Sequence, residues 1–367
     1  MQVEALDTVV RWEIELESKP DFAQAMERIY AWYEQQVIDR PPVRFSRHNA
    51  EYEAADDIWK FEWRSLRDKW LDEEYQLDRF LTQVKGKRYH GETFPVFWPN
   101  LGPSVFSAFY GAGLEFGEVT TWALPVLEDY DRSLALDQAG EYYRKLESLT
   151  RSALEICSDR FLVGYSDLHP GLDGVAALRG TEALLLDMVD APERPKPALK
   201  QLTSDFLKVY DLFDAMLKAG GQPSVTWMAI PSFGKMHIPS CDCAGMISPR
   251  QFREFALPAL VEEAEHMTHN IFHMDGKGVA RHLDTILSIP NIHAIQWVQG
   301  VGDDLPIMQW LPLIKRIQAA GKSVVVDLNV AELDDFMGAV DPEGILLTLA
   351  SESEEEEETI LKRVSKW

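Results

Sequence analysis

A histidine and an aspartate stand two positions apart at the end of an apolar run, where residues 270–276 read NIFHMDG. Side chains at positions i and i+2 of a strand point to the same side, so His273 and Asp275 would project together from one strand end. An imidazole and a carboxylate can bind a divalent metal, hold a polar substrate group or transfer protons. The alternative is a purely structural role, in which Asp275 caps the next helix and His273 is a polar side chain with its hydrogen bonds made inside the protein.

Other apolar runs end in comparable residues, and long amphipathic helical patterns alternate with them. The candidate strands are 94–98, 119–123, 161–165, 225–230, 270–273, 294–298, 323–328 and 345–349. This alternation predicts an α/β protein with a single (β/α)8 TIM barrel, whose active site lies at the carboxyl ends of the strands. The candidate substrate-binding residues at those ends are Trp98, Asn100, Asp167, His169, Trp227, Gln296, Trp297, Gln299, Asp327 and Asn329, together with His237 on a glycine-containing loop.

The first ninety residues have a different pattern. Apolar residues recur at helical spacing in 6–17, 22–37 and 56–80. We therefore expect residues 1–90 to form a helical N-terminal extension packed on a barrel of residues 91–367. The tryptophans at the predicted strand ends suggest a pocket for a flat, apolar or cationic group, although core packing is the simpler role for any one of them.

Composition narrows the function classes. The chain has 367 residues, 46% hydrophobic and 26% charged, with a net charge of −24. Such a charge argues against nucleic acid and against anionic membrane surfaces as partners. No run approaches the ~20 apolar residues of a membrane span. Three cysteines give no disulfide framework and the N-terminus has no signal-peptide pattern, so we expect a cytoplasmic protein.

Two of the cysteines flank an aspartate in a predicted loop. Asp242 is a candidate catalytic acid, and Cys241 and Cys243 could be metal ligands, redox-active thiols or small loop residues without a role. The remaining candidates are histidines that fall in helices or connections, and we expect these to be structural. They are His266, His269, His282 and His293.

The same loop begins the stretch that most resembles a known family. Residues 241–258 read CDCAGMISPRQFREFALP, with further support from FLVGY at 161–165 and NIHAIQW at 291–297. These stretches resemble the uroporphyrinogen decarboxylase superfamily over about residues 90–367. That superfamily contains tetrapyrrole decarboxylases and cobalamin-linked methyltransferases, and the resemblance implies a barrel enzyme.

Two departures separate the chain from the tetrapyrrole decarboxylases. Those enzymes carry substrate-binding arginines after the first strand and a catalytic aspartate after the second. Here the predicted first strand is followed by WPNLGP at 98–103, and the second contains TTW at 120–122. Decarboxylation of a polyanionic porphyrinogen is therefore disfavoured.

The methyltransferase branch resembles the chain more closely. Its members hold zinc through His-x-Cys after one strand and a further Cys after the last. Here His273, Asp275 and Glu352 stand at those positions, with Asp242, Cys241 or Cys243 as alternative ligands. Carboxylates in place of thiolates favour an oxygen- or nitrogen-bearing substrate and admit other divalent metals.

The resemblance thus implies methyl transfer between a small substrate and a corrinoid or thiol carrier, with possible zinc assistance and a homodimer as the expected assembly. A corrinoid would arrive on a partner protein, because the chain contains no corrinoid-binding motif of its own. Two alternatives stay open. One is a metal-independent decarboxylase or lyase on a small acid, with Asp242 or Asp167 as proton donor. The other is a non-catalytic tetrapyrrole- or corrinoid-binding protein.

Overall fold

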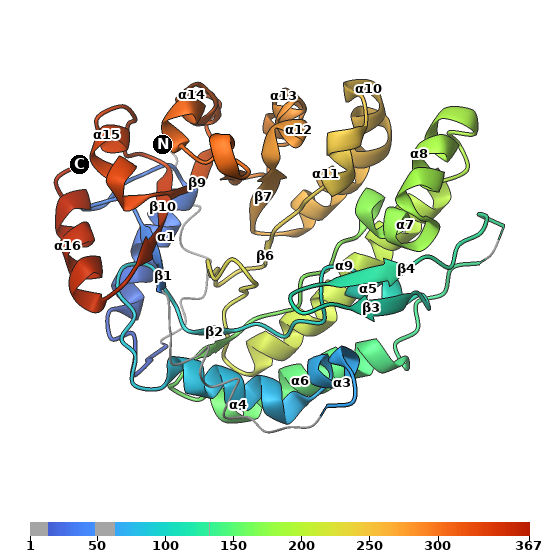
Figure 1. The fold of residues 1–367 in the computed structure, drawn as a ribbon, viewed down its shortest axis with the longest axis horizontal. Helices are drawn as coiled ribbons and strands as arrows, with labels where there is room; N and C mark the ends of the chain where they lie inside the picture. The colour runs from blue at the N-terminus through green and yellow to red at the C-terminus, as the bar shows by residue number, and fades with distance from the viewer. Residues whose placement is uncertain (1–13, 48–62, 132) are drawn as a thin grey trace, which may run out of the picture.

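A curled parallel sheet forms one side of the molecule (Figure 1). The structure, a computed structural model, describes residues 14–47, 63–131 and 133–367. Six strands pair in the order β1-β10-β9-β8-β7-β6, all parallel. Their bounds are β1 Val43–Arg47, β6 Met236–His237, β7 His269–Asp275, β8 Ala294–Val298, β9 Ser323–Leu328 and β10 Ile345–Ser351. The fold is therefore mixed α/β, with a parallel sheet as expected.

The second half of the sheet agrees closely with the sequence. β8 and β9 coincide with the predicted strands 294–298 and 323–328, and β7 and β10 contain the predicted strands 270–273 and 345–349. Their central residues are fully buried, as in parallel strands covered on both faces. Continuous apolar runs bounded by turns were sufficient to find them.

The first four predicted strands differ more from the structure. β2 (Val96–Phe97) and β5 (Leu162–Val163) form a separate two-stranded parallel pair. The expected strand at 119–123 instead falls on an antiparallel hairpin, β3 (Gly113–Phe116) and β4 (Thr121–Leu124). The expected strand at 225–230 contains a turn, because Ala229 has a φ of +52° and donates its N–H to Thr226.

The described strands thus form six-, two- and two-stranded sheets and not one continuous eight-stranded ladder. Hydrogen bonds outside these ladders also join segments that flank the sheets. Tyr165 N donates to Val225 O over 2.9 Å, and Glu92 N donates to Val43 O over 2.7 Å.

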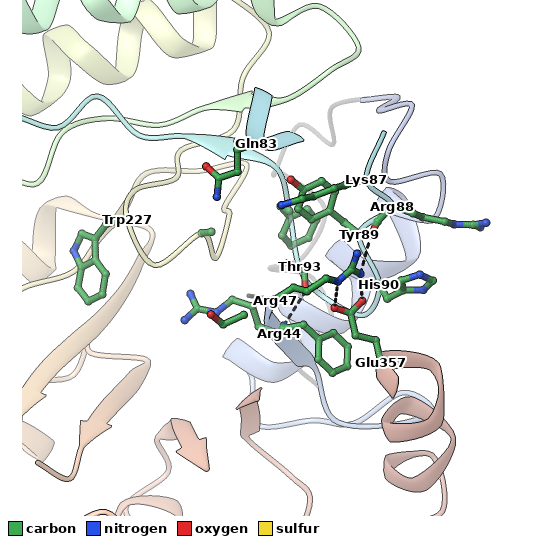
Figure 2. Close-up of a pocket in the computed structure, with 14 residues that line it drawn as sticks. Arg44, Arg47, Gln83, Lys87, Arg88, Tyr89, His90, Thr93, Trp227 and Glu357 are labelled. Carbon is green, nitrogen blue, oxygen red and sulfur yellow. Dashed lines mark hydrogen bonds and ion pairs between the residues drawn. The ribbon is translucent and has the colours of Figure 1, made fainter. Parts of the chain in front are cut away.

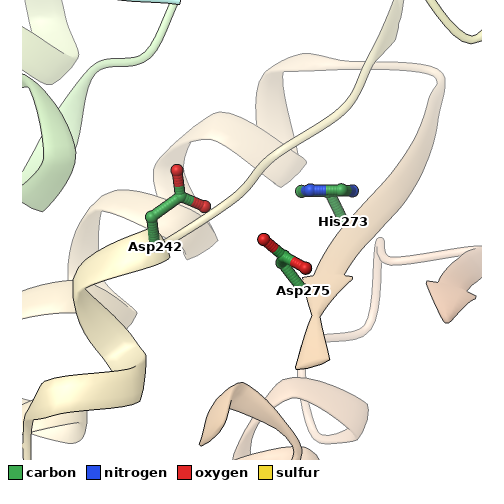
Figure 3. Close-up of side chains that lie close together, drawn as sticks. All are labelled: Asp242, His273 and Asp275. Atoms are coloured by element: carbon green, nitrogen blue, oxygen red, sulfur yellow. The ribbon is translucent and has the colours of Figure 1, made fainter. Parts of the chain in front are cut away.

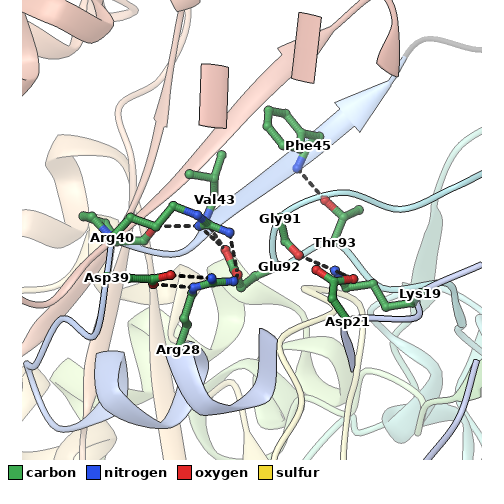
Figure 4. A network of polar contacts seen from close by, with 11 residues as sticks. Lys19, Asp21, Arg28, Asp39, Arg40, Val43, Phe45, Gly91, Glu92 and Thr93 are labelled. Atoms are coloured by element: carbon green, nitrogen blue, oxygen red, sulfur yellow. Dashed lines mark hydrogen bonds and ion pairs between the residues drawn. The ribbon is translucent and has the colours of Figure 1, made fainter. Parts of the chain in front are cut away.

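The N-terminal region contributes a strand that its helical pattern did not reveal. Beside helices, it supplies β1, which pairs with β10 at the edge of the six-stranded sheet. The buried carboxylate of Glu92 fixes this strand, since it accepts hydrogen bonds from Val43 N, Arg40 and Arg28 (Figure 4). Two arginines compensate the burial of this carboxylate.

Helices form an arc around the sheet (Figure 1). Of the predicted N-terminal helices, 22–37 contains α1. The described part of 56–80, which begins at residue 63, contains α3 and the start of α4, and 56–62 and most of 6–17 lie outside the described residues. No helix of the described ranges is both long and apolar enough to cross a membrane. The helix bounds are α1 Phe22–Tyr33, α3 Leu66–Trp70, α4 Glu73–Val84, α5 Val105–Ala108, α6 Glu141–Cys157, α7 Gly171–Arg179, α8 Thr181–Asp190, α9 Lys196–Ala219, α10 Pro249–Gln251, α11 Leu257–His266, α12 Gly276–Ala280, α13 Leu283–Leu287, α14 Leu311–Ala319, α15 Leu333–Met337 and α16 Glu354–Val364. Tighter or wider turns are η1 Asp242–Met246, η2 Phe252–Ala256, η3 Gly302–Asp304, η4 Ile307–Trp310 and η5 Val330–Glu332.

Candidate functional site

Three potential metal ligands meet at the carboxyl end of β7. Asp242 begins η1, and His273 and Asp275 stand at the end of the strand (Figure 3). One ligand atom from each of the three residues lies within 4.8 Å of the others. Both carboxylates are exposed and the imidazole is half-buried, so the group is open to a small ligand.

Strand geometry explains why these three side chains converge. The segment before η1 runs parallel to β7, since Ser240 forms a bridge with His273 and His273 N donates to Pro239 O over 3.0 Å. Ser240 and Asp242 are two positions apart, as are His273 and Asp275. The bridge holds this segment against the end of β7, and η1 begins two residues later, which brings Asp242 close to His273 and Asp275.

Asp173 in the first turn of α7 fixes the position of Asp242. Its carboxylate accepts the backbone N–H of Asp242 over 2.8 Å and that of Cys243 over 3.0 Å. Desolvation by the surrounding protein, followed by the charge of Asp173, raises the pKa of Asp242. The site therefore concentrates negative charge where a cation would offset it.

Gln296 and Trp227 orient the imidazole of His273. The Gln296 Oε1 atom lies 2.6 Å from His273 Nδ1, and an amide oxygen only accepts, so Nδ1 carries the hydrogen. The lone pair of Nε2 is then available to a ligand. The ring of Trp227 meets the imidazole edge-to-face, with 5.4 Å between centroids. This support resembles the outer partners that orient metal-binding histidines in proteins.

The donor set fits a divalent metal. Two carboxylates and one imidazole provide three ligands and leave open positions, as catalytic zinc sites require. The predicted third ligand Glu352 does not join them: it is exposed, and its backbone N–H bonds to Glu356 in the first turn of α16. Asp242 takes that place, because the loop before η1 runs beside β7 whereas β10 lies three strands away.

The two cysteines near Asp242 do not contribute to the group of three. Cys241 and Cys243 are 3% and 4% exposed. Desolvation is the main cause that raises the pKa of both thiols, and the charge of Asp173 adds to it. Protonated, buried thiols are poor ligands and nucleophiles, so the structure favours the role of small packing residues.

A second polar group adjoins the first. Asp167 Oδ2 lies 2.7 Å from His169 Nε2, and Ser240 Oγ lies 2.9 Å from His169 Nδ1. Burial opposes the charged form of His169, but Asp167 outweighs it and raises the pKa of the imidazole to about 10. Burial also acts to raise the pKa of Asp167, yet the charge of His169 lowers it below its usual value. Asp167 is therefore ionised and is not itself a proton donor.

Several predicted pocket residues have structural positions instead. His237 is 2% exposed in β6, between Tyr165 and Glu263, so it does not lie on a mobile lid. Trp297 is fully buried against Trp310, because it points to the outer side of β8. The side-chain amides of three other predicted residues bond to backbone groups of nearby loops. Asn100 closes a turn onto Gly102, Gln299 joins the carbonyls of Leu305 and Asp327, and Asn329 caps η5.

Two residues near the predicted mouth have a buried polar atom that forms no hydrogen bond among the described residues. Trp98 is half-buried, and its Nε1 has no hydrogen-bond partner among the described residues. One carboxylate oxygen of Asp327 likewise has no hydrogen-bond partner among the described residues. Burial raises the pKa of this carboxyl group. Across the sheet, Asp327 is in register with Thr348, and Thr348 with Arg44 of β1.

A cavity of about 300 Å³ lies between β1 and Trp227 (Figure 2). Its wall is rich in cationic side chains, of which Arg44 donates to Met228 O and Arg47 pairs with Glu357. The lining residues are Arg44, Phe45, Ser46, Arg47, Gln83, Lys87, Arg88, Tyr89, His90, Thr93, Phe94, Trp227, Ala229 and Glu357. The segment 98–103 contains no arginine, whereas β1 contributes Arg44 and Arg47 to this wall.

Sequence reasoning missed Arg44, Asp173 and Ser240. The alternation of apolar Val43 and Phe45 with polar neighbours was a strand signal that could have revealed Arg44. Ser240 stands two positions before Asp242, the same spacing that drew attention to His273 and Asp275. Asp173 acts through backbone contacts, for which the sequence carries no signal.

Comparison with known proteins gives a likeness in fold. No family model and no curated protein matches the chain. Among solved structures, a methyltransferase from Methanosarcina mazei is similar, with a TM-score of 0.62 and 12% identity over 93% of this chain and 98% of that one. At this identity the likeness concerns the arrangement of the backbone. It spans nearly the whole of both chains.

Proposed function

We propose that this protein is a methyltransferase-like enzyme that moves a methyl group between a small substrate and a corrinoid or thiol carrier. The observation that carries the proposal is the group formed by Asp242, His273 and Asp275 at the carboxyl end of β7. Likeness to a methyltransferase fold supports it. We take the curled sheet together with β2 and β5 as a variant of the (β/α)8 barrel, whose reactions occur at that end.

The three ligands would hold zinc or another divalent metal. When bound, such a metal supplies Lewis acidity to an oxygen or nitrogen atom of the substrate. Gln296 keeps His273 in the ligating tautomer, and Asp173 holds the backbone that carries Asp242. Trp227 separates His273 from the cationic cavity and forms an apolar wall for a small methylated compound. The hard ligand set favours an oxygen- or nitrogen-bound methyl group over a thioether.

The proposal is tested by metal analysis and turnover on the same preparations. Wild type, His273→Ala and the control His266→Ala are measured by elemental mass spectrometry after zinc loading. His266 is a suitable control because it bonds to Asp211 and Lys235, away from the three ligands. We expect about one metal per chain, lost only in His273→Ala. A folded, metal-free wild type would refute metal assistance.

Methyl transfer is measured with O-methyl and N-methyl donors and free cob(I)alamin or a thiol as acceptor. Formation of methylcobalamin or of a methyl thioether in wild type supports the enzyme. Binding of a corrinoid without turnover would favour the non-catalytic alternative.

A specific observation also supports the lyase alternative. The raised pKa of Asp242 is what a general acid requires. Release of CO2 from a small acid by metal-free protein, lost in Asp242→Asn, would select this reaction.

A further inference from the structure

Ser240 is a fourth polar side chain on the face formed by the three candidate ligands. It is the bridge partner of His273 and lies two positions before Asp242. Registered residues of neighbouring parallel segments point to the same side, and so do alternate residues of one segment. The bridge therefore places Ser240 beside His273, and Asp242 lies near both His273 and Asp275. Ser240 is half-buried.

Unlike its three neighbours, Ser240 is backed by a histidine and an aspartate. His169 uses both ring nitrogens, Nε2 on Asp167 at 2.7 Å and Nδ1 on Ser240 at 2.9 Å. The ionised carboxylate of Asp167 only accepts, so Nε2 carries a hydrogen. The remaining nitrogen faces only a hydroxyl, which can accept its hydrogen or donate to its lone pair.

The charge around His169 decides between these two states. Carboxylates other than the three candidate ligands act on the ring from several elements: Asp167 beside it, Asp173 of α7 and Glu263 of α11. The imidazolium form is favoured, and the pKa of about 10 agrees with this surplus of acids. Nδ1–H then donates to Ser240 Oγ, which leaves the hydroxyl hydrogen of Ser240 free to point toward the face shared with His273.

We propose that Ser240 is a catalytic residue that donates its hydroxyl proton to the leaving atom of the methyl donor, with His169 and Asp167 as positioning residues behind it. The proposal rests on the proposed function, since it assigns the proton that methyl transfer from an oxygen or a neutral nitrogen requires.

The step balances as follows. The bond between the methyl carbon and the donor oxygen breaks, and its electron pair stays on oxygen. The methyl carbon bonds to an electron-pair donor, either a thiolate or a cobalt(I) corrinoid. The oxygen takes the proton of Ser240 Oγ–H, and Oγ regains a proton from Nδ1 of His169. Neutral His169, still held by Asp167 through Nε2–H, is reprotonated from solvent.

This mechanism predicts a dependence on the leaving group. An alkoxide leaving group needs a proton, whereas a quaternary ammonium donor leaves as a neutral amine and needs none. We therefore expect Ser240→Ala to lower kcat by about 10²–10⁴-fold with an O-methyl donor, the usual contribution of a general acid. With tetramethylammonium the loss should stay within about threefold, because no acid assistance is removed.

Three further variants sharpen the test. Ser240→Thr keeps the hydroxyl and should restore most of the O-methyl activity. Asp167→Asn should reproduce part of the loss, and Ser288→Ala, an exposed serine on the far end of α13, should have no effect. Equal losses with both donors, or none in Ser240→Ala, would overturn the role of Ser240 while methyl transfer itself stands.

A measurement without substrate separates the two proposals. The ring of His169, labelled with 15N and assigned through His169→Gln, should be an imidazolium at pH 7.5 in wild type and neutral in Asp167→Asn. A neutral ring in wild type would overturn the relay whether or not methyl transfer is found. A charged ring in a protein without any methyl transfer would contradict the proposed function and leave the relay in place for another proton-requiring reaction.

Discussion

The two ends of β7 carry histidines with opposite surroundings. His269 opens the strand and is 5% exposed, stacked on Tyr33 with 4.0 Å between ring centroids. His273 lies four residues later on the same face of the strand, half-buried beside two exposed carboxylates. One end is closed by aromatic packing, and the other is open to a ligand.

The electrostatic surroundings of the two ends also differ: the closed end disfavours a charged histidine, and the open end has carboxylates around its histidines. Desolvation and the neighbouring His293 lower the pKa of His269 to about 3, so this ring stays neutral. At the other end, carboxylates of Asp242 and Asp275 face His273, and Asp167 holds His169 charged. One residue type on one strand is thus enclosed by aromatic packing at the amino end and stands among open carboxylates at the carboxyl end.

The largest expected effect is at the open end. His273→Ala should abolish binding of one metal per chain and lower methyl transfer on the order of 10³-fold, since a bound metal contributes several kcal/mol to such reactions. The melting temperature should change little because the side chain is half-buried and leaves an open position. Calorimetry measures the melting temperature, and elemental analysis measures the bound metal. A large loss of stability with the metal retained would mean that His273 serves packing and not metal binding.

The closed end should determine acid stability. His269 and His293 have pKa values of about 3 and about 4 in the folded protein, against 6.5 for an unperturbed histidine. Between these limits the unfolded chain binds more protons than the folded one. Stability is therefore fully present above pH 6.5 and falls as the pH drops toward 4, by about 1.4 kcal/mol per pH unit for each histidine.

A substitution isolates the contribution of one of these rings. His269→Phe keeps the stacking on Tyr33 and removes one titrating group, although it also removes the bond to Ser232. Urea unfolding at pH 7, 6, 5 and 4 should show a slope reduced by about half relative to wild type. An unchanged slope would indicate that the acid sensitivity arises elsewhere.

The sequence revealed the open end better than the rest of the molecule. Apolar runs ending in polar residues located β7 to β10 and placed His273 and Asp275 together, because a strand's period of two is visible in the sequence. Glu352 was predicted as third ligand but does not join the group of three, since neighbourhood across the sheet depends on strand order. β1 was missed because it is a short strand between helices, and Trp297 was misplaced because a continuous apolar strand does not show which side is inward.

A smaller effect is expected at the support of the open end. Asp173→Asn keeps the shape of the side chain but weakens the bonds to Asp242 N and Cys243 N, which now have a neutral acceptor. Metal affinity should fall by about 10–100-fold, as for other groups that orient ligands. Competition with a chromogenic chelator measures this affinity. Asp211→Asn, which removes a carboxylate from His266 and Lys235 far from the ligands, serves as control.

The smallest effect is expected for the two cysteines beside Asp242. If sulfur completed the metal site, replacing either thiol would cost as much as replacing His273. Burial and the raised pKa of both thiols argue instead that Cys241 and Cys243 only fill space under the loop. Cys241→Ala and Cys243→Ala should therefore keep metal affinity within about twofold while losing up to about 1 kcal/mol of stability from lost packing. A cobalt(II)-loaded protein reports the same point directly: an intense thiolate-to-metal charge-transfer band that disappears in either variant would make sulfur a ligand, and the open end of β7 would then be a site of softer chemistry than its carboxylates indicate.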